Sequence, residues 1–134
     1  MAQTLTRLLV HIIFSTKERQ NLIPAAVEAE LYAYLGGICR GADSPLLQVG
    51  GTANHLHLLV SLSKNLALSA LLLDLKRDSS KWIKSKGAPL ADFHWQDGYG
   101  AFSVGAAPVA AVTAYIQRQQ ERHQTMTFEQ EFVE

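Results

Sequence analysis

The segment 54–62 constrains the fold most, because its alternation is that of a β-strand with one buried face. Every second residue of this segment is apolar, and these residues share one face of the expected strand, namely Leu56, Leu58, Val60 and Leu62. A period of two places His55 and His57 together on the opposite face. We therefore expect a strand with a hydrophobic side toward a core and two neighbouring imidazoles on its other side.

The other expected elements follow from similar patterns. Residues 8–14 are apolar and β-branched, which predicts a first strand. Pro24 opens a helix that should end near Gly36, Gly37 and Gly41. Residues 46–49 should pair with 54–62 across a tight turn at Gly50-Gly51, and residues 66–86 should form a long amphipathic helix.

Towards the C-terminus, Gln96-Asp97-Gly98 is a turn signal that lies between two short aromatic strands, 93–95 and 99–104. Pro108 opens a last helix that runs through His123, and Thr127 with Gln130 resembles a capping box. The order is thus β, α, β, β, α, β with an appended tyrosine-bearing helix. This order predicts an α+β, ferredoxin-like split βαβ fold, with helices on one face of an antiparallel sheet, in a single domain of residues 1–134.

Composition excludes several classes of protein. One cysteine, Cys39, cannot form an internal disulfide, so we expect a cytoplasmic chain and a buried thiol. No apolar run is long enough to cross a membrane. Twelve basic and twelve acidic residues balance, which argues against a protein that coats nucleic acid indiscriminately. The balance is uneven along the chain, because residues 64–86 hold six basic and two acidic side chains.

Two groups of residues could carry chemistry. His55 and His57 could share a metal ion, although spacing alone favours a pair of partly exposed strand histidines without a ligand. Tyr115 and Gln119 lie four residues apart, on one face of the last helix. A phenol can attack phosphorus and stay attached as an ester, but its high pKa requires a nearby cation or base. The ordinary alternative is that Tyr115 packs against the sheet and Gln119 is solvated.

These residues carry a resemblance to a known family. The motifs are His55-Leu56-His57 and Tyr115-Ile116-Gln117-Arg118-Gln119, supported by His11–Lys17, Gly50-Gly51, Leu75-Lys76-Arg77, Ser79–Ile83 and Trp95–Tyr99. Together they resemble the small single-tyrosine HUH transposases of bacterial insertion sequences and their REP-associated relatives. One departure is Asn54, because relatives commonly carry an acidic residue just before the first histidine.

The resemblance implies an enzyme that cleaves and rejoins single-stranded DNA at hairpin-bearing element ends. In that family the tyrosine forms a 5′-phosphotyrosine intermediate, so Tyr115 would be the nucleophile. His55, His57 and Gln119 would bind Mg²⁺ or Mn²⁺, and no nucleotide cofactor is needed. The resemblance also implies a homodimer that shares active sites between subunits, in the bacterial cytoplasm and at the nucleoid when bound to DNA.

A basic helix face is the expected DNA contact. Its candidate residues are Lys76, Arg77, Lys81 and Lys84, with Trp95 and Tyr99 available to stack on unpaired bases. A solvated helix face is the ordinary explanation of such a run. His11 and His123 are accessory candidates, and His11 is more typical of a structural histidine. The competing function is a catalytically inactive, ferredoxin-like nucleic-acid-binding protein derived from such a transposase.

Overall fold

Strand β3 lies in the middle of an antiparallel sheet whose strand order is β2-β3-β1-β4. The computed structural model describes residues 4–105 and 109–118. The strands are β1 (Leu8–Ser15), β2 (Leu46–Gly51), β3 (His55–Leu62) and β4 (Gly100–Val104). The helices are α1 (Glu28–Gly41), α2 (Leu68–Lys84) and α3 (Val109–Gln117), with short 3-10 turns η1 (Lys17–Arg19), η2 (Ala25–Val27) and η3 (Ala88–Leu90).

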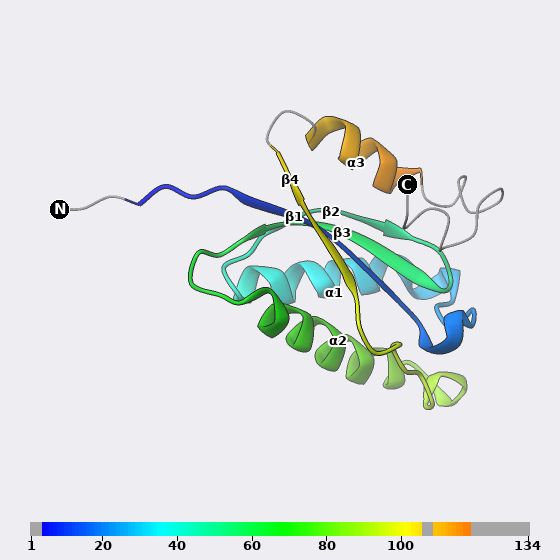
Figure 1. The fold of residues 1–134 in the computed structure, drawn as a ribbon. Coiled ribbons are helices and arrows are strands. Elements are labelled where there is room, and N and C mark those ends of the chain that lie inside the picture. Colours follow the sequence, from blue (N-terminus) through cyan, green and yellow to red (C-terminus); the bar gives the residue numbers. More distant parts are fainter. Residues whose placement is uncertain (1–3, 106–108, 119–134) are drawn as a thin grey trace.

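Helices cover both faces of the sheet, but unequally. Figure 1 shows α1 and α2 side by side on one face and the shorter α3 on the other. The predicted ferredoxin-like α+β fold with an appended helix is therefore confirmed. Within the described ranges, no helix is long and apolar enough to cross a membrane.

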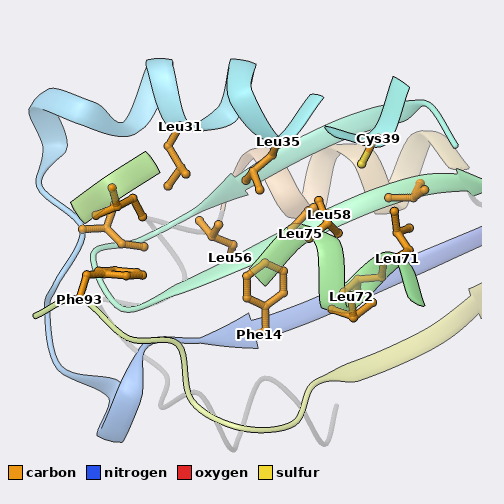
Figure 2. Close-up of a cluster of buried hydrophobic side chains, with 14 residues drawn as sticks. Phe14, Leu31, Leu35, Cys39, Leu56, Leu58, Leu71, Leu72, Leu75 and Phe93 are labelled. Carbon is orange, nitrogen blue, oxygen red and sulfur yellow. The ribbon is translucent and has the colours of Figure 1, made fainter. Parts of the chain in front are cut away.

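The main core lies between the sheet and the α1–α2 layer. The apolar face of β3 enters it as the alternation predicts, and Leu56, Leu58 and Val60 are fully buried. Figure 2 shows the helical side chains that meet this face, among them Leu31, Leu35, Cys39, Leu71, Leu72 and Leu75. Cys39 is a buried free thiol, as expected, and burial raises its pKa to about 11.

The expected turn at Gly50-Gly51 is wrong. Both glycines belong to β2, where Gly50 pairs with His57 and Gly51 with Leu56, and the chain turns at residues 52–54 instead. A β-carbon at Gly51 would lie 2.2 Å from the backbone oxygen of His55, so that glycine is required by the close approach of the chain to itself. This glycine pair therefore allows close packing of the backbone. The sequence alone does not distinguish such a pair from a glycine turn.

The expected aromatic hairpin is also wrong, because only its second strand forms. β4 pairs with β1, whereas Trp95 makes an isolated bridge to Thr16. The Trp95 ring packs edge-on against Phe14 and Phe93, and its indole N–H donates to Ser79 Oγ at 2.9 Å. Side-chain packing against the core thus outweighs the local turn signal at residues 96–98.

The expected helices form with modest changes of length. α1 passes through Gly36 and Gly37 and ends at Gly41, because its buried residues hold it on the core despite the low helix propensity of glycine. α2 is slightly shorter than the expected 66–86. The described part of the last helix is α3, and Pro108, Gln119, His123, Thr127 and Gln130 lie outside the described residues.

Candidate active site

His55 and His57 project from β3 toward the α3 side of the sheet, on the same face as predicted. Both are buried, with exposed fractions of 0% and 1%, so the partial exposure expected in the alternative without a ligand is wrong. Their ring centroids lie 5.1 Å apart. Burying an imidazole costs free energy unless its nitrogens meet polar partners or a metal ion, so the partners of these ring nitrogens show what the pair can do.

The Nδ1 atom of His55 is held by the turn that precedes β3. It lies 2.7 Å from Asn54 Oδ1 and 3.0 Å from Thr52 Oγ1. The Asn54 amide nitrogen donates to Asn21 Oδ1 at 3.2 Å, and this contact orients the amide oxygen toward His55. As the Asn54 oxygen can only accept, Nδ1 of His55 carries the proton, and Nε2 is left with the lone pair that a metal ion needs.

The Nδ1 atom of His57 has a different partner, because it lies 2.9 Å from His11 Nε2. His11 comes from β1 and is part-buried, and burial lowers its pKa. The Nδ1 atoms of both strand histidines are therefore engaged within the protein, while both Nε2 atoms are buried. Each ring can present the same nitrogen to an ion.

Tyr115 is brought to this pair within one chain. Its ring centroid lies 5.8 Å from that of His57 and 6.1 Å from that of His11, edge-on in both cases. α3, which carries Tyr115, packs mainly on β2 and also on β3 (Figure 1). Three aromatic side chains from three elements thus meet around one point on this face of the sheet.

Gly50 lets α3 approach the sheet closely. A β-carbon at Gly50 would lie 2.6 Å from the backbone oxygen of Ile116, the residue after Tyr115. Ile116 itself is fully buried, so moving the helix away from Gly50 would expose an apolar side chain. Sequence reasoning missed this role of Gly50, although a glycine inside a strand pattern is a signal for close backbone approach.

The donor set fits a divalent ion only in part within the described residues. Two imidazole nitrogens are in place, but these residues hold no group of three or more His, Cys, Asp and Glu side chains that could bind a metal. The expected third ligand, Gln119, is an amide and lies outside the described residues. Two neutral nitrogens and an amide oxygen would leave coordination positions for phosphate oxygens, as a catalytic ion requires.

The four basic residues expected to contact DNA lie on α2, which covers the face of the sheet opposite to this site (Figure 1). The Lys76 ammonium donates to the backbone oxygens of Gln96 and Gly98, and burial lowers its pKa while Asp97 raises it. Arg77 forms ion pairs with Asp74 and Asp78. Arg77 and Lys81 are exposed, Lys84 is part-buried and Tyr99 is 42% exposed, so Arg77, Lys81 and Tyr99 are the more accessible members of the set.

Comparison with known proteins decides the family. The model of the family described as "Transposase IS200 like" matches residues 4–119. The chain belongs to the IS200-like transposase family. The matched range includes both histidines, Tyr115 and Gln119. Among curated proteins, none matches this sequence.

Two solved structures share the fold of this IS200-like transposase. A candidate transposase from Deinococcus radiodurans R1 has a TM-score of 0.69 at 21% identity, over 89% of this chain and 95% of that one. A REP-associated tyrosine transposase bound to a REP hairpin has a TM-score of 0.65 at 11% identity, over 92% of this chain and 74% of that one. At such identities the likeness supports the architecture described above.

The close packing of α3 on Gly50 leads to a testable expectation. We expect Gly50→Ala to displace α3 and to lower DNA cleavage by at least about tenfold, because overpacking of this kind costs about 1–3 kcal/mol. The matched control is Gly36→Ala in α1, where an added β-carbon meets no atom within 4 Å. Thermal unfolding and single-turnover cleavage of both variants check this. Equal cleavage rates in the two variants would show that close docking at Gly50 is unnecessary.

Asn54 gives a second expectation. Replacing it by alanine removes the amide oxygen that accepts from His55 Nδ1. If the pair binds Mn²⁺, its affinity should then fall about tenfold, the lower end of the usual 10–100-fold effect, because Thr52 remains. Asn54→Asp should bind Mn²⁺ at least as tightly as the natural chain, since a carboxylate is a stronger acceptor. Titration calorimetry compares the three proteins. Unchanged affinity in Asn54→Ala would exclude this role.

Proposed function

We propose that this transposase cleaves and rejoins single-stranded DNA at hairpin-bearing ends through a covalent link to Tyr115. The observation that carries the proposal is the meeting of Tyr115 with the buried pair His55 and His57 in one chain. Packing of a tyrosine against the sheet does not by itself explain two buried imidazoles whose Nδ1 atoms are both held by neighbouring side chains. A solved structure with the same fold, a tyrosine transposase bound to a REP hairpin, supports the proposal.

The proposed reaction is a transfer of a phosphoryl group to the phenol. Tyr115 Oη attacks the scissile phosphorus, the bond from phosphorus to the 3′-oxygen breaks, and a 5′-phosphotyrosine and a free 3′-hydroxyl result. The phenol gives up one proton and the leaving oxygen takes up one, so the step is balanced. Attack by another 3′-hydroxyl on the phosphotyrosine reverses it, which explains why no nucleotide cofactor is required.

His55 and His57 are the proposed ligands of Mg²⁺ or Mn²⁺, through their Nε2 atoms, with Gln119 as the proposed third. Such an ion, when bound, polarises the scissile phosphate and stabilises the leaving oxygen. The role of the protein is to hold both imidazoles in one tautomer and to place the phenol beside them. Imidazole ligands suit Mn²⁺ better than Mg²⁺, so we expect the higher affinity for Mn²⁺.

Recognition of DNA is proposed to use basic residues of α2 for backbone contacts, chiefly Lys81 and Lys84, because Arg77 is engaged by Asp74 and Asp78. The chain carries no net charge, so its overall field contributes little to affinity. Contacts to a folded hairpin and to the scissile phosphate would then supply most of the binding energy. A homodimer with shared sites remains a prediction from the family, although the described residues already join Tyr115 to His57 within one chain.

The decisive assay mixes the protein with Mn²⁺ and labelled single-stranded oligonucleotides that carry hairpins, and resolves the products on a denaturing gel. We expect a covalent protein–DNA band that EDTA abolishes. Duplex oligonucleotides of the same sequence serve as the substrate control and should give no band. Hairpin binding without any covalent band, across the element's own end sequences, would instead support the catalytically inactive binding protein.

A further inference from the structure

His11 makes a direct contact with one of the two proposed metal ligands. Its Nε2 atom lies 2.9 Å from Nδ1 of His57, and the two ring planes are inclined by 33° with centroids 5.1 Å apart. The contact is diagonal across the sheet, because His57 pairs with Ile13 and His11 with Leu59 in the β1–β3 ladder. A hydrogen bond at this distance contains one proton between the two nitrogens.

The position of that proton decides whether His57 can bind a metal ion. If His57 Nδ1 holds it, the neutral His57 ring has its lone pair on Nε2, which is the buried nitrogen next to His55. If His11 Nε2 holds it and donates to His57, the proton of neutral His57 lies on Nε2 and blocks coordination. Only the first arrangement is compatible with a bound ion.

We propose that His11 is a positioning residue that accepts the Nδ1 proton of His57 and so fixes the metal-binding tautomer and the ring orientation. Asn54 does the same for His55, since its amide oxygen lies 2.7 Å from His55 Nδ1. The two proposed ligands are thus oriented from different elements. A residue of the turn before β3 orients His55, and a residue of β1 orients His57. Such outer partners tune metal affinity in proteins.

The surroundings of His11 suit this role. Its ring is flanked by Tyr115, with centroids 6.1 Å apart at 78°, and by Phe102, with centroids 6.5 Å apart at 56°. These contacts restrict rotation of the His11 ring, and a restricted acceptor holds its partner in one orientation. As far as it concerns a metal ion, this inference rests on the function proposed above.

The test compares two substitutions of His11. His11→Phe keeps a flat ring but removes the acceptor, whereas His11→Gln places an amide near the position of Nε2 and can still accept. We expect His11→Phe to weaken Mn²⁺ binding by about 10–100-fold and His11→Gln to bind within a few-fold of the natural chain. The matched control is His94→Phe, which removes an exposed histidine and should leave Mn²⁺ affinity unchanged.

A second readout needs neither metal nor DNA. Nitrogen NMR of histidine-labelled, metal-free protein reports which nitrogen of His57 is protonated. We expect Nδ1–H in the natural chain and in His11→Gln, with a shift toward Nε2–H in His11→Phe. This measurement on the natural chain remains decisive even if His11→Phe fails to fold.

The outcomes separate this inference from the proposed function. Tight Mn²⁺ binding and the Nδ1–H tautomer that both persist in His11→Phe would overturn the role of His11 and leave the proposed function intact. Failure of the natural chain to bind Mn²⁺ would overturn both. Weakened binding in His11→Phe with rescue in His11→Gln, together with the tautomer change, would establish His11 as the positioning residue.

Discussion

Replacing Tyr115 by phenylalanine is expected to abolish the covalent protein–DNA band and to lower strand cleavage by at least about 10³-fold, because the only proposed nucleophile is removed. Phenylalanine retains the ring, so the edge-on contacts to His57 and His11 remain available. We therefore expect unchanged hairpin affinity and thermal stability within about 0.5 kcal/mol. Single-turnover cleavage, hairpin binding and thermal melting measure the three quantities.

Tyr99→Phe is the matched control for this substitution. It removes only the hydroxyl of a tyrosine that is 42% exposed, and it keeps the ring that the expected stacking on bases would use. We expect Tyr99→Phe to form the covalent band at the natural rate. A band that persists in Tyr115→Phe would refute the assignment of the nucleophile, whatever the control shows.

Replacing His57 by alanine is the other substitution with a large expected effect. Cleavage should fall by about 10²-fold or more, because Lewis-acid stabilisation of the phosphate contributes several kcal/mol. Mn²⁺ affinity should fall in parallel, and excess Mn²⁺ should restore part of the rate. His94→Ala is the control, since that histidine is exposed. A cleavage rate that is indifferent to His57→Ala would exclude the metal site.

Mixing the two inactive variants distinguishes a site within one chain from a shared site. In a dimer that exchanges α3, Tyr115→Phe and His57→Ala proteins would complement each other, since one of the two hybrid sites has both residues. The structure joins Tyr115 to His57 in the same chain, and α3 packs closely over the Gly50 backbone there. A site within one chain therefore predicts no recovery of cleavage in the mixture, whereas the shared site implied by the family predicts substantial recovery.

Much of the fold follows from periodicity alone. The alternation in β3 predicted both its buried apolar face and the shared face of the two histidines, because a strand has only two sides. The helical pattern likewise located α1 and α2 to within a few residues. These elements are long, and their apolar positions agree with the local propensities.

Tertiary packing explains what the sequence did not reveal. Gly50 and Gly51 carry the composition of a turn, yet they lie in β2 because α3 and the following turn approach their backbone closely. Trp95 packs against the core through Phe14, Phe93 and Ser79, and no local pattern marks these contacts. Local signals cannot report such long-range contacts.

In the candidate site, too, some residues were indicated by the sequence and others depend on tertiary contacts. The resemblance to a family pointed to His55, His57 and Tyr115, and the structure brings these three together. The sequence named His11 as an accessory candidate but not its contact with His57, which depends on the β1–β3 register. The contacts of Thr52 and Asn21 depend on the turn before β3 and could not be predicted. Asn54, which departs from the acidic residue of relatives, still supplies an acceptor oxygen to His55.

The most direct test of a tyrosine-linked reaction is the identity of the amino acid that carries the DNA. The covalent adduct formed with a hairpin oligonucleotide and Mn²⁺ is digested with protease and nuclease, and the remaining peptide is sequenced by mass spectrometry. We predict a single modified residue, Tyr115, that bears a 5′-nucleotide phosphate. A 5′-phosphate on any other residue, or cleavage without a covalent adduct, would contradict the proposed function.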